Sequence, residues 1–273
     1  MNIVVSRFNK NIDWIYKIKD ENILVYDKQN DQNIYNIPVN KGNEASVYLK
    51  YIIDFYNNLP EYTFFIHDDE YAWHHTGSII NKYYKGLEEI KKNNTLYINI
   101  NDKIILGSII SNPWYNNIMN WYNDYIEQYI PMNELPNKDW TQGYYGSAQF
   151  FVHKSLILNL PLIFYKNLYN WIITTNLSNA ESGRYLEWTW HLFWVIYPKI
   201  KNKIINNKKI SNNEIEKSEI EKSEIEKSKI PIDFNWKKYL INNKFLLNQN
   251  INSQKMAINH YMKIGIHKNL KYN

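Results

Sequence analysis

Short apolar runs alternate with stretches of helical periodicity along the first third of the chain. Residues 3–8, 23–26 and 62–66 are runs with the length and composition of buried strands. Between them, residues 12–19 and 43–57 repeat apolar side chains at three- or four-residue spacing, which predicts two helices with one buried face each. Strands that alternate with helices are typical of an α/β fold with parallel strands.

The alternation continues with less regular spacing as far as residue 196. We expect two more strands and four more helices, the strands over residues 96–100 and 147–152 and the helices over 78–92, 114–129, 162–175 and 182–196. This succession predicts a single α/β domain over residues 1–205, which is a usual size for one domain.

The composition changes after this domain. The motif Glu-Ile-Glu-Lys-Ser occurs three times in succession within residues 212–229. It has too few apolar residues to pack and a period that suits neither helix nor strand, so we predict a low-complexity charged linker over residues 206–231. The last segment, residues 232–273, is compatible with a small module of two short helices, with Gly265 as a helix C-cap.

Charge and composition narrow the function classes. The net charge is +5, and the lysines are spread along the chain without a concentrated basic stripe before the C-terminus, so we expect no nucleic-acid partner. The chain has no cysteine, which excludes disulfides and thiolate zinc sites. We expect a cytoplasmic protein, because the N-terminus lacks the pattern of a signal peptide and no apolar run is long enough to be a transmembrane segment.

The clearest chemical signal is an acidic run directly after an apolar strand. Asp68, Asp69 and Glu70 follow residues 62–66 almost at once. In an extended segment Asp68 and Glu70 would lie on the same side. Carboxylates in this position can bind Mn²⁺ or Mg²⁺, and a solvated acidic turn is the alternative.

Histidines and a late carboxylate extend the candidate set. His74 and His75 follow the acids, and one of them could contact a metal or a ligand or transfer a proton. The alternative is that one ring packs beside Trp73 and the other is exposed. If residues 182–196 are helical, Glu187 and His191 share one helix face. The pair could deprotonate an acceptor hydroxyl or complete a metal site, and a buried structural hydrogen bond is an equal alternative.

The ends of the first two strands and the middle of a later one supply further candidates. Arg7 and Asn9 follow the first strand and Asp27 follows the second, where α/β nucleotide-binding folds place their ligand contacts. Gln149 lies within an apolar strand, so its amide needs a partner, either a ligand or a structural hydrogen bond.

These segments also resemble a known family. Residues 4–9, 44–60 and 64–75, followed by Ala148-Gln149-Phe150 and residues 186–191, are similar in order to the blocks of an uncharacterised family of domains of unknown function that has GT-A glycosyltransferase-like features. The resemblance implies a GT-A-like, Rossmann-like mixed sheet flanked by helices, with a small helical appendage at the C-terminus. It also implies that Asp68 and Glu70 are metal-binding acids and Glu187 a catalytic or acceptor-side acid. The metal acids of such enzymes usually come after more βα units than the two counted here.

The C-terminal segment carries a second resemblance. Residues 236–240, 257–261 and 265–269 are similar to a small helical module that is often appended to glycosyltransferases and other polysaccharide-assembly proteins. This resemblance implies that the segment packs or docks and has no part in catalysis.

Three functions follow as hypotheses. The first is a metal-dependent glycosyltransferase that moves a sugar from a nucleotide-sugar donor to a hydroxyl of a glycan or protein acceptor. In this hypothesis Arg7, Asn9 and Asp27 hold the nucleotide. The second is a metal-dependent hydrolase that uses the Asp/His cluster. The third is a non-catalytic carbohydrate-binding or scaffold protein.

Overall fold

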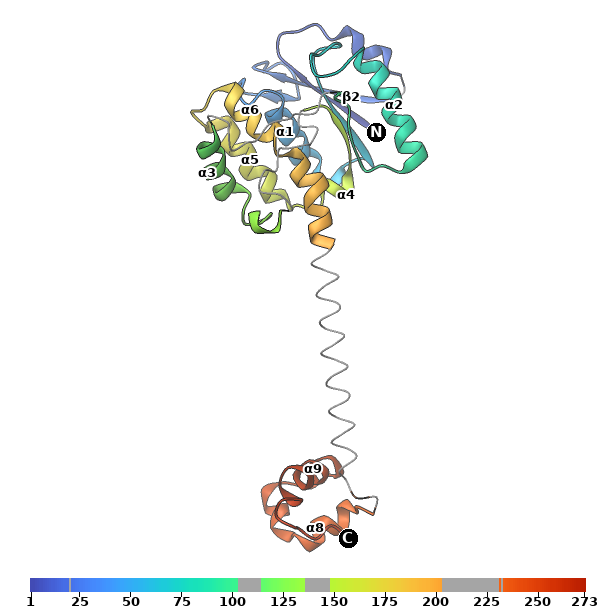
Figure 1. The fold of residues 1–273 in the computed structure, drawn as a ribbon, viewed down its shortest axis with the longest axis vertical. Coiled ribbons are helices and arrows are strands. Elements are labelled where there is room, and N and C mark those ends of the chain that lie inside the picture. Colours follow the sequence, from blue (N-terminus) through green and yellow to red (C-terminus); the bar gives the residue numbers. More distant parts are fainter. Residues whose placement is uncertain (20, 103–113, 136–147, 203–230, 232) are drawn as a thin grey trace. The chain divides into compact units, whose positions relative to one another are not determined.

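The structure is a computed structural model that describes residues 1–19, 21–102, 114–135, 148–202, 231 and 233–273. Its contacts divide the chain into two compact units, Met1–Lys203 and Ile204–Asn273 (Figure 1). Residues 206–230 of the predicted linker lie outside the described residues. None of the described helices has the length and apolar content needed to cross a bilayer.

A mixed six-stranded sheet, with the order β3-β2-β1-β4-β6-β5, forms the centre of the first unit. Four strands run parallel, namely β1 (Asn2–Arg7), β2 (Asn22–Lys28), β3 (Asn36–Ile37) and β4 (Tyr62–His67). The strand β6 (Phe150–His153) is antiparallel to both of its neighbours, β4 and β5 (Tyr97–Asn99). The predicted α/β fold with a mixed sheet is confirmed.

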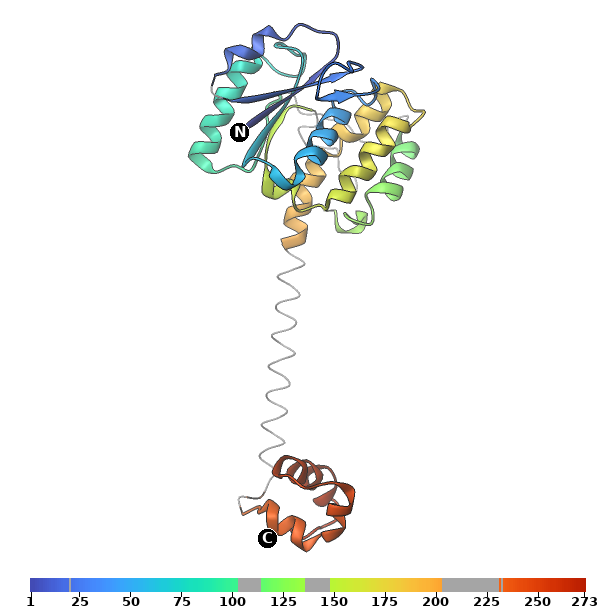
Figure 2. The same cartoon turned by 180° about the vertical axis from the view of Figure 1, so that it is seen from behind.

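Helices cover both faces of this sheet (Figures 1 and 2). On one face the sheet shares an apolar core with the helices α1 (Ala45–Phe55), α3 (Tyr115–Tyr125), α5 (Leu162–Thr174) and α6 (Asn179–Glu187) and the π-helical η5 (Leu192–Ile196), and within this core α3 packs against α5. The other face packs against α2 (Ile79–Asn93) and the short 3₁₀ helix η1 (Asp13–Lys17). Side chains alternate along each strand, so Val4 and Phe65 belong to the α1 side and Ile3 and Phe64 to the α2 side.

The helix ends are set by local sequence. The N-cap of α2 is Ser78, whose Oγ accepts a hydrogen bond from the backbone N–H of Ile80, and its C-cap is Asn94 in the left-handed region. The entry to α1 is less regular. Gly42 and Asn43 both have positive φ, and a Cβ on Gly42 would lie 2.0 Å from Cδ1 of Ile172. This tight left-handed turn fixes where the next residue, Glu44, points.

Differences from the predicted elements are local. The predicted helix over residues 12–19 is the 3₁₀ helix η1, the two-residue strand β3 was not predicted, and β6 begins at Phe150. The predicted helix over residues 182–196 is broken. α6 ends at Glu187, residues 188–189 form a turn, and helical structure resumes through η5.

Over residues 233–273, which the structure describes, the second unit contains four short helical segments, α8 (Trp236–Asn242), η6 (Lys244–Gln249), α9 (Gln254–His260) and η7 (Tyr261–Gly265). Its core is built around Tyr239, which is fully buried and whose hydroxyl lies 2.7 Å from Nδ1 of His260. Gly265 has no positive φ and the backbone stays helical at Ile266, so it is not the predicted C-cap. A glycine is required there for space, because a Cβ would lie 2.6 Å from the Tyr239 hydroxyl.

Candidate functional site

The carboxyl ends of the parallel strands bring polar residues together on the α1 side of the sheet. Ser6 in β1 is in register with Tyr26 in β2 and His67 in β4. Side-chain alternation places Ser6, Lys28 and His67 on the same face as the buried Val4, Tyr26 and Phe65, one step further along each strand. On this face, each of the three adjacent strands therefore changes from an apolar to a polar side chain as it reaches its carboxyl end.

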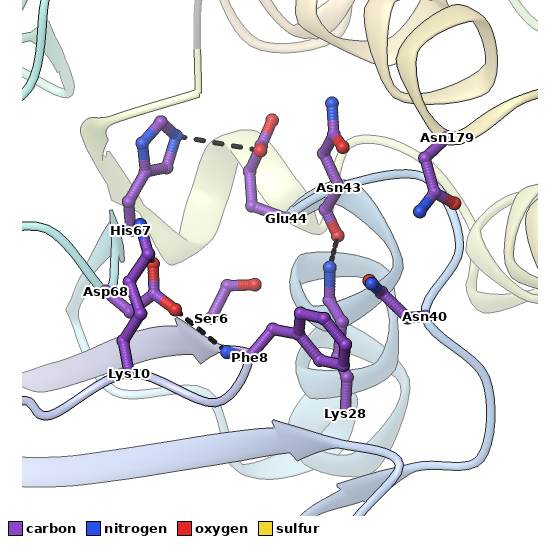
Figure 3. Close-up of a pocket in the computed structure, with 10 residues that line it drawn as sticks. All are labelled: Ser6, Phe8, Lys10, Lys28, Asn40, Asn43, Glu44, His67, Asp68 and Asn179. Atoms are coloured by element: carbon purple, nitrogen blue, oxygen red, sulfur yellow. Dashed lines mark hydrogen bonds and ion pairs between the residues drawn. The ribbon is translucent and has the colours of Figure 1, made fainter.

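These residues line a cavity of about 250 Å³ (Figure 3). It lies where β1 is flanked by β2 on one side and β4 on the other, which is the point at which the strand order reverses. Ligands of open α/β sheets bind at such switch points, outside the carboxyl ends of the strands. The full lining is Ser6, Phe8, Lys10, Lys28, Asn40, Asn43, Glu44, His67, Asp68 and Asn179.

Lys28, the last residue of β2, brings a buried amine to this cavity. It is 5% exposed, and burial lowers the pKa of its ammonium group to about 8, although the charges of Glu44 and Asp68 act in the opposite direction. Its Nζ donates a hydrogen bond to the backbone carbonyl of Asn43 (Figure 3). A lysine amine has three donors, so it can also donate to a ligand in the cavity that it lines.

Glu44 brings a buried carboxylate from the N-terminus of α1. Its side chain is 8% exposed, Oε2 lies 3.6 Å from Nε2 of His67, and Oε1 is buried without a hydrogen-bond partner. Burial raises the pKa of this carboxyl group, and the nearby charge of Asp68 adds to the rise. A hydrogen bond from the backbone of Glu44 itself and the charges of Lys28 and Arg184 oppose it. A buried polar atom without a partner is costly and calls for an explanation, and a ligand in the cavity would supply one.

His67 completes the inner wall of the cavity. Burial lowers the pKa of its imidazole to about 4, so the ring is neutral near pH 7. Its backbone N–H donates to Oε1 of Gln149, and the side-chain nitrogen of Gln149 lies 2.8 Å from Nε2 of His74. Because an amide nitrogen only donates, His74 accepts this bond. The structure thus places Gln149 and His74 in a network behind the cavity rather than in its lining.

The three consecutive acids diverge. Asp68 lines the cavity, where Oδ2 accepts a 2.8 Å hydrogen bond from the backbone N–H of Phe8 and Oδ1 lies 3.5 Å from Nζ of Lys10. Asp69 is 46% exposed and is 2.6 Å from the same Lys10 amine. Glu70 accepts a 2.8 Å hydrogen bond from Ser78, the N-cap of α2. Asp68 and Glu70 therefore do not share the cavity.

The histidine after His74 is also buried away from the cavity lining. His75 is 7% exposed, and burial lowers the pKa of its imidazole. The predicted metal ligands Asp68, Glu70, His74 and His75 therefore do not gather around one point. Within the part of the chain that the structure describes, no three His, Cys, Asp or Glu side chains form a group that could hold a metal ion.

Glu187 and His191 face different surroundings. Glu187 lies 2.8 Å from the guanidinium of Arg184. Burial raises the pKa of Glu187 to about 8, and the nearby charge of Glu44 contributes to this rise. Glu187 therefore lies close enough to the cavity to be coupled to it electrostatically. His191 is 3% exposed and lines a second cavity of about 410 Å³ beside β5, together with Tyr97.

The predicted nucleotide contacts at the strand ends have structural partners. Arg7 Nε lies 2.7 Å from Oδ1 of Asp27, whose Oδ2 accepts hydrogen bonds from Asn30 and Asn33. Asn9 is exposed and has a positive φ of 57°, typical of a turn. Arg7 and Asp27 are in register on neighbouring strands.

Sequence reasoning missed the buried pair that dominates the cavity, Lys28 and Glu44. Two signals point to them. Lys28 ends a strand whose preceding alternate residues, Leu24 and Tyr26, are apolar and buried. Glu44 lies between a left-handed Gly-Asn turn and a strongly apolar helix.

Comparison with known proteins gives one result. No curated protein and no solved structure matches the chain. A family described as "Protein of unknown function (DUF3431)" matches residues 3–206, a span that includes every residue lining the cavity. The match covers well over half of the chain, so the chain belongs to the DUF3431 family, as the resemblance to an uncharacterised family led us to expect.

Proposed function

We propose that the protein is a GT-A-like glycosyltransferase that moves a sugar from a nucleotide-sugar donor to a hydroxyl of a glycan or protein acceptor. One observation carries the proposal. The cavity at the switch point of the sheet combines buried amine and carboxylate groups, which is the chemistry needed to hold a charged donor and to accept a proton. The mixed sheet, with one antiparallel strand beside its parallel strands, is compatible with a GT-A architecture.

The cationic groups of the cavity suit the diphosphate of the donor. Lys10 and Lys28 both line it, and two phosphates would bring negative charge to their amines. The charge added by a phosphate would also favour the protonated form of Lys28, which burial disfavours in the free protein. Arg7, Asn9 and Asp27 lie outside the lining of this cavity, and side-chain alternation places Arg7 and Asp27 on the other face of the sheet from Ser6 and Lys28. They would contact a nucleoside only where the donor extends past the ends of β1 and β2.

A divalent cation fits this site only together with the donor. Asp68 is the one predicted metal acid that lines the cavity, and no protein-only group of ligands exists among the described residues. Mg²⁺ is commonly held by one or two carboxylates together with substrate phosphates, so Asp68 and a diphosphate would suffice. When bound, Mn²⁺ or Mg²⁺ would neutralise charge on the leaving diphosphate.

We assign the role of general base to Glu44. The acceptor oxygen would form a bond to the anomeric carbon of the donor while the bond from that carbon to the phosphate oxygen breaks. The proton of the acceptor hydroxyl would pass to the carboxylate of Glu44, and the nucleoside diphosphate would leave. The unpartnered Oε1 of Glu44 supports this assignment. Glu187, the acid implied by the resemblance, does not line the cavity, and burial together with the nearby charge of Glu44 raises its pKa, so we assign it no part in the proton transfer.

The test measures binding and turnover of a panel of UDP- and GDP-sugars, with and without Mn²⁺. We expect one donor class to bind with Mn²⁺ and to be turned over, and Asp68→Asn to abolish both effects. Asp69→Asn is the matched control, because this neighbouring carboxylate also pairs with Lys10 but lies outside the cavity lining.

Two outcomes would overturn the proposal. Metal held tightly in the absence of nucleotide, with hydrolysis of a substrate, would favour the hydrolase. Glycan binding that is unaffected by Asp68→Asn and by a chelator, without binding of any nucleotide, would favour a non-catalytic carbohydrate-binding protein.

A further inference from the structure

The positive charge of the protein is concentrated in its last segment. Residues 233–273 contain seven lysines, one aspartate and no arginine or glutamate. This excess of six positive charges is larger than the net charge of +5 of the whole chain, so the remainder is slightly negative. The second unit therefore has an electrostatic character of its own.

All of this charge is displayed on the surface. Each of the seven lysines is exposed, namely Lys237, Lys238, Lys244, Lys255, Lys263, Lys268 and Lys271. The core of the unit is formed without them, by Tyr239, Leu240, Leu246, Ala257 and Tyr261. Because the core does not include the lysines, they are available to a partner.

Large apolar side chains are displayed alongside the lysines. Five of them are 40–63% exposed, Ile241, Phe245, Leu247, Met256 and Ile264. The first unit, which has several times as many residues, has eight described side chains of this class. The second unit thus exposes more large apolar side chains per described residue than the first unit does.

The two kinds of side chain are interleaved. Phe245 follows Lys244, Met256 follows Lys255, and Ile264 follows Lys263, and all six of these residues are exposed. On α8, Lys237 and Ile241 are four residues apart and share one helix face. Each helical segment thus presents an exposed apolar side chain within four residues of an exposed lysine, so both kinds of group are available to a surface that offers negative charge and an apolar layer.

We propose that this C-terminal module docks on the surface of a membrane that contains anionic lipids. Its lysines would pair with the headgroups, and its exposed apolar side chains would enter the boundary of the acyl chains. A nucleic acid would satisfy the lysines but would leave the apolar side chains in water. Aromatic platforms stack on bases, and four of the five exposed side chains are aliphatic or thioether groups. Lipid is therefore the partner that uses both features.

The test uses the full chain and co-sedimentation with vesicles of phosphatidylcholine alone or with about one-third phosphatidylglycerol. We expect at least tenfold stronger partition onto the anionic vesicles, weakening as salt is added. Replacing both Phe245 and Leu247 by serine, or both Lys237 and Lys244 by glutamine, should each reduce that partition at least fivefold.

Matched controls come from the first unit. Ile34→Ser changes the most exposed large apolar side chain, and Lys85→Gln with Lys91→Gln removes exposed lysines of α2. Both should leave partition unchanged. The proposal is overturned if neutral and anionic vesicles bind equally, if neither binds, if the control variants lose as much as the module variants, or if a DNA oligonucleotide binds more tightly than the vesicles. Failure here would leave the glycosyltransferase assignment untouched, because nucleotide-sugar binding is measured without lipid.

Discussion

The cavity of the first unit and the C-terminal module (residues 233–273) differ in where they place charged side chains. Around the cavity, Lys28 and Glu44 are buried and the side chain of Glu187 is 12% exposed, and burial disfavours the charged form of each of them. In the module every lysine is exposed, and the core is built from tyrosines and aliphatic residues. Charge that is buried lowers stability unless it is compensated, whereas displayed charge costs the fold little.

This contrast indicates what each region requires to function. A fold that keeps an unpartnered carboxylate oxygen and a buried amine at a sheet switch point is arranged for a ligand that complements them. The core of the module contains no lysine or carboxylate, and its charged side chains are exposed, where they can contact a large charged surface. Substitutions in the cavity should therefore affect reactivity and stability, and substitutions of exposed side chains on the module should change partner binding alone.

The largest expected effect comes from Glu44→Gln. Loss of a general base should lower kcat about 10²- to 10⁴-fold, while nucleotide binding stays within a few-fold of the original protein. The pH profile supplies a second readout. Because a base acts only when deprotonated, kcat should rise with pH through the raised pKa of Glu44, and this rise should disappear in the variant. Turnover that is unchanged by Glu44→Gln would remove Glu44 from the chemistry.

The next effect is on stability, from Glu187→Gln. The pKa of Glu187 is raised to about 8, so the folded protein holds this proton more tightly than the unfolded chain does. Its contribution to stability is fully present below pH 4.5 and is lost as the pH rises through 8. The glutamine variant avoids this loss and should gain about 4 kcal/mol relative to the original protein between pH 5 and pH 9.

Urea unfolding at the two pH values measures this difference. Asp124→Asn is the control, because its carboxylate is exposed on α3 and should give the same difference at both pH values. A Glu187→Gln variant whose advantage did not grow with pH would show that Glu187 is ionised at little cost. The contrast between buried and displayed charge would then be weaker than proposed.

The sequence predicted best those strands and helices in which one hydrophobic period continues from end to end. Alternation and apolar runs placed β1, β2 and β4 within about two residues of their bounds, and the strand ends they define are the ends that meet at the cavity. The position of Asp68 at the cavity follows from this, because it comes directly after β4.

Sequence reasoning failed where a local change of backbone breaks the period. The prediction that Asp68 and Glu70 lie on one side assumed the two-residue alternation of a strand. The strand β4 ends at His67, so this alternation does not apply to the acids that follow. The four-residue spacing of Glu187 and His191 spans the turn at residues 188–189. Glu44 was missed because its direction depends on the left-handed turn before it, and that turn depends on a distant contact with Ile172.

The smallest predicted effect is confined to the module. In Gly265→Ala the new Cβ would lie 2.6 Å from the hydroxyl of Tyr239, so the two helices that pack on this tyrosine must separate slightly. We expect a local loss of about 1–2 kcal/mol, measured as faster hydrogen exchange in peptides that cover residues 236–265. Asn259→Ala, an exposed position on α9, is the control and should leave exchange unchanged or slower, since alanine favours helix. Nucleotide-sugar binding should be the same in both variants, because the cavity is built entirely within the first unit. If Gly265→Ala weakened nucleotide binding as well, the two regions would be coupled, and the assignment of reactivity to one and surface docking to the other would fail.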